Sequence, residues 1–185
     1  MGEFTMKPAQ TGASPMPGVT VCSRKSLVML DMRLARSASQ QAVEAVLGTS
    51  LPLPLRSNQC ADGTILRLSP NQWLLVAQQG GRWSEELSLP GASVCDVSHG
   101  RIALRLSGPH VRDALGKGCM VDLNPGVFQP EMCIQTAIDK VPVIVNRLEG
   151  VDAAYDLYAA RSYAASFRHW LAEAAREYGC ELTDW

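Results

Sequence analysis

The sequence predicts an α+β fold of two small lobes, in which antiparallel or mixed sheets are flanked by helices. Three observations support this prediction. Apolar and polar residues alternate in several short segments, most clearly in residues 101–107, as in a strand with one buried face. Residues 162–178 repeat apolar side chains every three or four positions, as an amphipathic helix does. No long linker interrupts the 185 residues, so they form one domain or two closely packed lobes.

The first third of the chain begins with a segment that has no hydrophobic period. Residues 1–18 are rich in Pro, Gly, Ser and Thr and predict a flexible lead, partly vector-derived, ahead of a single α+β unit over residues 19–185. Short strands are expected at 19–21 and 26–34. Ser37 or Ser39 is expected to cap a helix that runs to Leu47 and ends at Gly48.

Turn residues divide the next segment into short pieces. The two prolines between Leu51 and Leu55 remove backbone donors and favour an extended connector over a central strand. Turn signals at 61–63 and 69–71 enclose apolar residues, and residues 72–78 predict a strand. A short helix is expected near 83–87.

The densest pattern lies between Val94 and Leu123. It predicts a strand, a turn at 98–100, the alternating strand 101–107, and a helix that Ser107 or Gly108 caps and residues 116–118 end. Three further strands are expected at 133–137, 141–147 and 155–158, before the final helix.

Composition excludes several classes of partner. The formal net charge is −1, so the chain has no excess of positive charge of the kind that binds nucleic acid or an anionic membrane. No apolar run reaches the length of a bilayer span, and no secretory signal pattern opens the chain, which predicts a cytoplasmic protein. The six cysteines form no C-x-x-C pair and are expected to be free, mostly buried thiols.

The residues provide no self-sufficient catalytic, cofactor or metal site. The phosphate-binding glycine motifs and G-x-S-x-G are absent, and the three histidines have no metal-ligand spacing. Lys117 is near Cys119 and could lower its pKa, although structural burial of this thiol is the favoured interpretation. Asp96, His99 and Arg101 form one suggestive polar cluster; a structural or interface ion pair is favoured there over an active site.

The central unit resembles a known family in its order of motifs. Residues 96–101 (DVSHGR), 104–109 (LRLSGP), Arg112-Asp113, 117–119 (KGC) and 122–123 (DL) resemble the gamma subunit of bacterial heterotetrameric sarcosine oxidase. The resemblance extends upstream to 68–75 (LSPNQWLL). Downstream it extends through 133–136 and 156–158 to the final helix, so it covers roughly residues 66–178.

This resemblance implies a fold like the first portion of the glycine-cleavage T-protein. It further implies a complex that oxidatively demethylates sarcosine to glycine, with the one-carbon unit passed to tetrahydrofolate or released as formaldehyde. FAD, FMN, NAD and tetrahydrofolate would then be bound by the partner alpha, beta and delta subunits, and no cofactor by this chain.

The leading hypothesis is a non-catalytic subunit that supports assembly of the flavoenzyme. A stand-alone folate-binding or aminomethyltransferase-like module, and an accessory subunit of an oxidase for another N-methyl amine, remain as alternatives. Aromatic and arginine side chains are the usual anchors of interfaces. The candidates for the subunit interface are Trp73, Trp83, His99, Arg101, Arg105 and Trp185.

Overall fold

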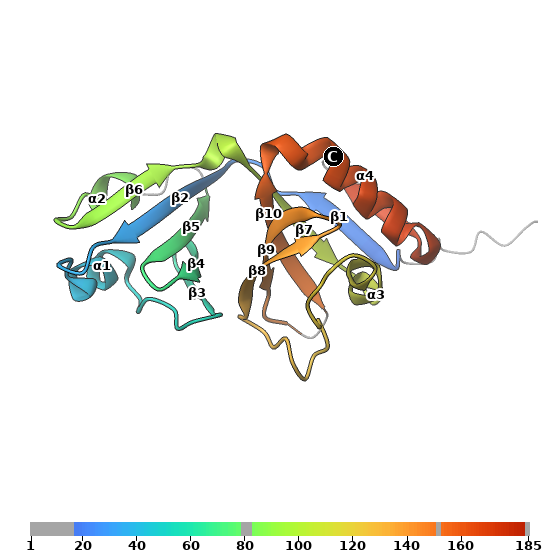
Figure 1. Ribbon diagram of the computed structural model, residues 1–185, viewed down its shortest axis with the longest axis horizontal. Helices are drawn as coiled ribbons and strands as arrows, with labels where there is room; N and C mark the ends of the chain where they lie inside the picture. The colour runs from blue at the N-terminus through green and yellow to red at the C-terminus, as the bar shows by residue number, and fades with distance from the viewer. Residues whose placement is uncertain (1–16, 79–82, 151–152, 184–185) are drawn as a thin grey trace, which may run out of the picture.

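The described residues fold into two lobes, each built of one sheet and two α-helices (Figure 1). The computed structural model describes residues 17–78, 83–150 and 153–183. Most of the predicted lead and the candidate Trp185 lie outside the described residues. The α+β prediction with two small lobes is confirmed.

The first lobe holds a five-stranded antiparallel sheet in the order β3-β4-β5-β2-β6. Its strands are β2 (Leu27–Leu34), β3 (Ser57–Cys60), β4 (Gly63–Ser69), β5 (Gln72–Gln78) and β6 (Ala92–Asp96). Its helices are α1 (Gln40–Leu47) and α2 (Trp83–Glu86). The helix expected near 83–87 is therefore confirmed.

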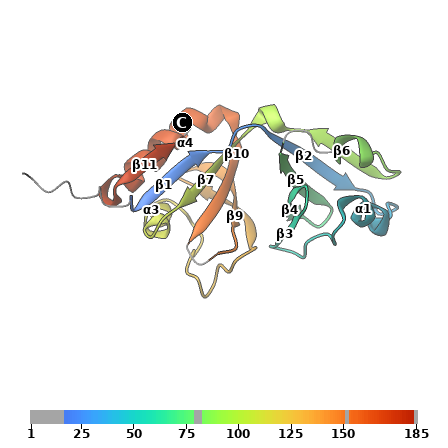
Figure 2. The ribbon, with the colours of Figure 1, turned by 180° about the vertical axis from the view of Figure 1, so that it is seen from behind.

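The second lobe holds a six-stranded mixed sheet in the order β11-β1-β7-β10-β9-β8. Only β1 and β11 pair in parallel, and Figure 2 shows them side by side. The strands are β1 (Val19–Ser23), β7 (Arg101–Ser107), β8 (Cys133–Ile138), β9 (Val141–Arg147), β10 (Ala154–Ala160) and β11 (Cys180–Thr183). The helices are α3 (Val111–Gly116) and α4 (Ala164–Ala175), with 3-10 turns η1 (Ser98–Gly100), η2 (Arg161–Tyr163) and η3 (Arg176–Tyr178).

Strand alternation distributes apolar side chains over three clusters. In the first lobe, one sheet face packs on the two helices through Trp73, Leu75, Val43 and Trp83. In the second lobe, one face packs on α3 and α4 in the same way. The remaining faces of the two sheets meet each other through eight buried residues: Met29, Leu66, Leu74, Val76, Ala103, Cys133, Ile144 and Tyr158. We call this set the interlobe cluster; it joins the lobes into one packed body.

Both ends of α1 and the end of α3 lie where the sequence predicts them, and the start of α3 does not. Ser39 caps α1, with its Oγ accepting from Ala42 N–H at 3.2 Å, and Gly48 follows in the left-handed conformation at φ 69°. The prediction that Ser107 or Gly108 caps α3 is wrong, because His110 is the N-cap. Gly108 instead passes the backbone of Gly18 so closely that a Cβ would lie 2.5 Å from its carbonyl oxygen.

Gly118, just after α3, lies against the indole of Trp170. A Cβ at this position would meet Trp170 Cζ2 at 2.4 Å, and the indole is stacked on Phe167. We expect Gly118→Ala to lower the free energy of unfolding by about 1–3 kcal/mol, because overpacking forces the neighbours to shift. Urea denaturation measures this change.

Gly116→Ala is the matched control, since nothing lies within 4 Å of a Cβ added there. The free energy of unfolding of this variant is expected to stay within about 0.5 kcal/mol of the parent or to rise, because alanine favours the helix. Equal losses in the two variants would contradict the steric explanation.

Candidate functional site

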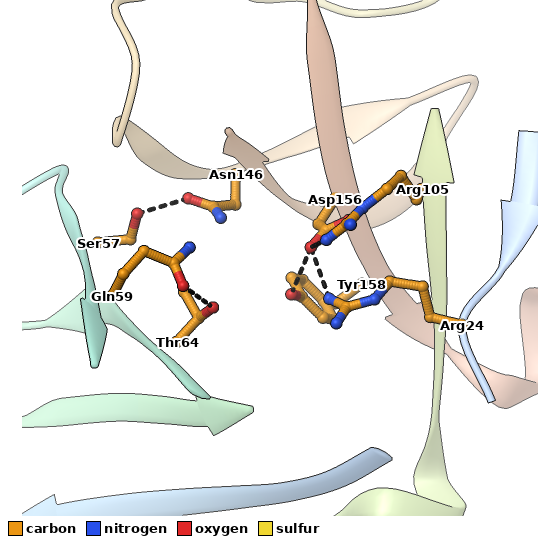
Figure 3. A network of polar contacts seen from close by, with 8 residues as sticks. All are labelled: Arg24, Ser57, Gln59, Thr64, Arg105, Asn146, Asp156 and Tyr158. Atoms are coloured by element: carbon orange, nitrogen blue, oxygen red, sulfur yellow. Dashed lines mark hydrogen bonds and ion pairs between the residues drawn. The ribbon is translucent and has the colours of Figure 1, made fainter. Parts of the chain in front are cut away.

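A carboxylate buried between two guanidinium groups is the main polar feature on the interlobe side of the second sheet. Asp156 on β10 is 1% exposed. Its Oδ1 accepts from Arg105 Nε at 2.8 Å, and its Oδ2 accepts from Arg24 at 2.6 Å (Figure 3). Arg105 also donates to Oδ2, so its contact is bidentate. We call these three residues the Asp156 triad.

Strand register explains why the triad forms. Asp156 and Arg105 are directly opposite each other in the antiparallel pair β10–β7, where side chains on one face are closest. Tyr158 shares this face because side chains alternate along β10, and its hydroxyl lies 3.4 Å from Asp156 Oδ2. Arg24 joins from the residue that follows β1.

A second polar contact links the lobes directly. Ser57 Oγ on β3 donates to Asn146 Oδ1 on β9 at 2.7 Å, and both residues are buried (Figure 3). In the same figure, Gln59 and Thr64 of the first lobe lie near this contact and bond to each other. Hydrogen bonds between buried polar groups offset their desolvation and fix how the two sheets meet.

The reactive side chains near this centre are held in their protonated forms. Burial raises the pKa of the Cys133 thiol to about 12. Burial, and then the neighbouring Asp156 carboxylate, also raise the pKa of the Tyr158 hydroxyl. Neither group has the lowered pKa of an activated nucleophile. Among the described residues, no three His, Cys, Asp or Glu side chains converge to hold a metal ion.

Cys133 is expected to resist alkylation in the native protein while Cys95 reacts. Cys133 is fully buried and Cys95 is exposed, and only an accessible thiolate attacks iodoacetamide. Treatment at about pH 8, followed by peptide mass spectrometry, should show Cys95 labelled about a hundredfold faster. Urea-denatured protein is the control in which both thiols react; equal rates in the native protein would contradict the burial of Cys133.

Lys117 does not activate Cys119. Its ammonium Nζ lies 2.6 Å from Glu177 Oε1 and also donates to the carbonyl of Ala174. Burial raises the pKa of the Cys119 thiol instead of lowering it. The suggestion that Lys117 lowers this pKa is therefore wrong, because the lysine is bound elsewhere.

The interface candidates from the sequence lie in different surroundings. Trp73 and Trp83 are core residues of the first lobe, 4% and 2% exposed, and contact its helices and sheet. Arg105 belongs to the Asp156 triad. His99 is exposed and Arg101 half-buried; His99 lies in η1, which connects β6 of the first lobe to β7 of the second, and Arg101 begins β7. Their role in a subunit interface stays a prediction.

Asp96 caps a turn in this structure. Its carboxylate accepts from the backbone N–H and from the hydroxyl of Ser98, at 2.8 and 2.5 Å. These two hydrogen bonds lower the pKa of the Asp96 carboxyl, with a smaller contribution from His99. The ion pair expected for Asp96 is therefore not found among the described residues, because its carboxylate is used by the turn at Ser98.

The comparisons with known proteins agree with this architecture. The model of the sarcosine oxidase gamma subunit family matches residues 33–177. The chain belongs to this family. Its relatives include the sarcosine oxidase subunit gamma of an Arthrobacter species, 34% identical over 77% of this chain and 72% of the relative. That of Corynebacterium strain P-1 is 32% identical over 76% and 71%.

Solved structures show that the similarity includes the three-dimensional fold. A chain of the heterotetrameric sarcosine oxidase from Corynebacterium sp. U-96, in complex with pyrrole 2-carboxylate, superposes with a TM-score of 0.78 and 25% identity over 86% of this chain and 85% of that chain. The aminomethyltransferase T of the glycine cleavage system from Bartonella henselae has a TM-score of 0.68 at 13% identity, over 90% of this chain and 48% of that one. The expected T-protein-like fold of this gamma-family member is confirmed. No helix among its described residues has the length and apolar character to cross a bilayer.

Proposed function

We propose that this chain is the non-catalytic gamma subunit of a heterotetrameric sarcosine oxidase and that it supports assembly of the flavoenzyme. The complex would oxidatively demethylate sarcosine to glycine, with the one-carbon unit passed to tetrahydrofolate or released as formaldehyde. The observation that carries the proposal is the match to a chain of the Corynebacterium heterotetramer over 86% of this chain and 85% of that chain.

The geometry between the lobes supports a scaffold role. The interlobe cluster fills the space where the two sheets meet. Beside it, the Asp156 carboxylate is bonded by two arginines and Asn146 Oδ1 accepts from Ser57 Oγ, while the buried Asn146 Nδ2 has no hydrogen-bond partner among the described residues. The thiol and the phenol there have raised pKa values. Buried side chains that bond to one another, rather than to a ligand, hold the two lobes in one arrangement. A rigid arrangement of this kind can present constant surfaces to partner subunits.

The partners would be the alpha, beta and delta subunits, in the cytoplasm. FAD, FMN, NAD and tetrahydrofolate would be bound by those subunits, as the family resemblance implies. Of the interface candidates, His99 and Arg101 are the two that this proposal retains, because both are at least partly exposed and lie where the chain passes from the first lobe to the second. Trp73 and Trp83 would act indirectly, by keeping the first lobe packed.

Co-expression of the tagged chain with the three partner subunits tests the proposal. We expect a yellow, flavin-bearing complex to co-purify and to produce hydrogen peroxide from sarcosine. Expression of the partners without this chain is the control and should lower the yield of assembled complex. A chain that purifies alone and colourless would contradict the proposal; titration of that chain with tetrahydrofolate would then test the folate-module alternative. If the purified complex oxidises a different N-methyl amine and not sarcosine, the substrate in this proposal is wrong and the role as an accessory subunit stands.

A further inference from the structure

Strand β8 forms one edge of the second sheet. It is the last strand in the order of that sheet and pairs along its length with β9, on the side of the second lobe nearest the first (Figure 1). Isolated bridges reach only its two ends, one from Arg56 and one from Cys119. Between them, residues 134–137 have no strand on their outer side among the described residues. We call this stretch the open edge of β8.

Neighbouring hydrogen bonds identify the backbone groups that face the open edge. Cys133 N–H donates to the carbonyl of Leu55 at 3.0 Å, away from β9. Alternate residues of an antiparallel strand direct their backbone groups to the same side, so Gln135 and Ala137 also point away from β9. Pro142, which has no N–H, is opposite Ala137, as suits a pair that exchanges no hydrogen bonds. Within the described ranges, neither Gln135 N–H nor Ala137 N–H has an acceptor.

The sequence of β8 leaves this edge unprotected. Natural edge strands are usually blocked by charged side chains, by proline or by their shortness. β8 (CIQTAI) has no charged residue and no proline, and its six residues make it longer than the other edge strands of the described chain, β3, β6 and β11. Such an edge is suited to pairing with an extended segment of another chain.

An apolar pocket adjoins the open edge. Its volume is about 150 Å³. A cavity of this size accommodates one benzene ring, so the pocket has room for one apolar side chain. Gln135 lines it as well, so the pocket lies directly beside the unpaired backbone. The apolar residues of its lining come from the connector, the β4–β5 turn and β8: Pro54, Leu55, Leu68, Pro70 and Ile134.

Exposed apolar residues flank both ends of the open edge. Leu55 is 58% exposed beside the start of β8, and Met120, next to the bridge at Cys119, is 84% exposed. Leu55 also has a left-handed backbone at φ 60°, which is unfavourable for leucine. Exposed apolar groups and local strain both concentrate at binding surfaces.

One short extended segment fits this place better than a second copy of the chain. The connector bonds to β8 at Cys133, and the carbonyl of Gly118 accepts from Asp139 N–H at 3.2 Å just after the strand. These two contacts limit the length of the open edge. A second copy that paired through its own β8 would bring the same connector and loop into the same space, because a two-fold contact uses one surface on both sides.

The charge beside the pocket restricts the composition of the segment. Arg67 lines the pocket, and its guanidinium donates to the carbonyls of Pro52 and Pro70 at 3.0 and 3.1 Å and lies 5.5 Å from the centre of the Trp73 ring. These neutral partners hold the group in place. A lysine or arginine of the bound segment would be repelled there, whereas an uncharged segment would not.

We propose that the open edge of β8 binds an extended, uncharged segment of a partner subunit, which joins the second sheet as a further strand and places one apolar side chain in the pocket. This inference rests on the proposed function, because it requires that the chain is a subunit. The segment would pair with the backbone of Gln135 and Ala137, as peptides do when they add to a sheet edge. Leu55 and Met120 would cover its two ends.

Competition for limited partner subunits tests the inference. Wild-type chain with one tag and Gln135→Pro chain with another are co-expressed in equal amounts with the partners. No hydrogen bond of the described fold uses the N–H that proline removes, and proline is accepted on edge strands, so the variant should fold. We expect it to be about tenfold under-represented in the purified complex, because one backbone hydrogen bond is lost and the ring obstructs the added strand.

Gln135→Ala is the matched control. It removes the same side chain, with its 2.7 Å hydrogen bond to the carbonyl of Leu68, and keeps the backbone N–H. This control should compete within about twofold of wild type. If Gln135→Pro competes as well as Gln135→Ala, and both keep the melting temperature of wild type, the inference is overturned while the proposed function stands. If wild type itself enters no complex, the proposed function fails and this inference with it.

A second pair of variants tests the pocket without a proline. Leu55→Asn removes apolar lining, and asparagine tolerates the left-handed backbone of this position. Leu53→Asn is its control, because Leu53 is 72% exposed on the same connector and does not line this pocket. We expect Leu55→Asn to be about fivefold under-represented and Leu53→Asn to compete equally. If Gln135→Pro does not fold, this pair decides, and equal competition by both variants overturns the inference.

A second copy of the chain is the other occupant that the experiment distinguishes. The mass of the isolated wild-type chain and of Gln135→Pro is measured by light scattering after size-exclusion chromatography. We expect the two masses to be equal. A wild-type dimer that Gln135→Pro converts to a monomer, together with equal competition for the partners, would overturn the partner assignment in favour of a pair of identical chains.

Discussion

Asp156→Asn is expected to lower the free energy of unfolding by about 3 kcal/mol, because two guanidinium groups lose their charged partner in a buried setting. The carboxylate is 1% exposed, while the Arg24 and Arg105 side chains are 19% and 42% exposed. Water therefore screens the two arginines in part, which keeps the expected loss at the low end for a broken buried pair. Urea denaturation followed by circular dichroism measures it.

Two further variants distinguish the stabilisation that the Asp156 triad provides from a general effect of removing one charge. Asp139→Asn makes the same change in the exposed turn between β8 and β9, where φ is 45° and asparagine is well tolerated; its effect should stay below about 0.5 kcal/mol. Arg105→Gln leaves Arg24 on the carboxylate and should cost about 1 kcal/mol. If Asp156→Asn is no more harmful than Asp139→Asn, the triad contributes nothing to stability.

Tyr158→Ala is expected to lower the free energy of unfolding by about 4 kcal/mol, since it opens a cavity where the two sheets meet. Tyr158 is fully buried in the interlobe cluster. Tyr158→Phe keeps the ring and removes only the hydroxyl near Asp156, so about 1 kcal/mol is expected. Chemical denaturation of both variants gives the comparison.

Tyr163→Ala supplies the control for loss of an aromatic ring, because Tyr163 is 40% exposed. Its free energy of unfolding should change by about 0.5 kcal/mol or less. Equal losses for Tyr158→Phe and Tyr158→Ala would show that the hydroxyl, and not the packed ring, stabilises the junction of the lobes.

Strands and helices with an apolar period were predictable from sequence. The alternation in residues 101–107 and the helical period after residue 162 correspond to β7 and α4. The edge strands β3 and β11 were missed. Their sequences, SNQC and CELT, are mostly polar, and such strands are held by backbone pairing with a neighbour rather than by a buried face. For β11 that neighbour is β1, which lies far away in the sequence.

The Asp156 triad was also missed, although one signal was present. A single carboxylate between the aromatic residues of the YDLY strand faces the same side as Tyr158 by alternation, and a buried acid requires a cationic partner. The partners could not be named, because Arg105 and Arg24 lie 51 and 132 positions away in the sequence. Strand order, which no local pattern specifies, brings them together.

The position of β1 between β7 and β11 has a consequence for how the protein is made. The chain enters the second sheet with β1, builds the whole of the first lobe, and returns to the second sheet at β7. During synthesis the first lobe is complete as a continuous stretch once β6 has emerged, and it can close its sheet there. The second sheet receives its last strand only with β11, which follows α4 in the chain and pairs with β1, the first strand of the described residues. Because β11 and β1 are neighbours at one end of the strand order, loss of either strand damages the same edge of the second sheet, which is completed later in synthesis than the first.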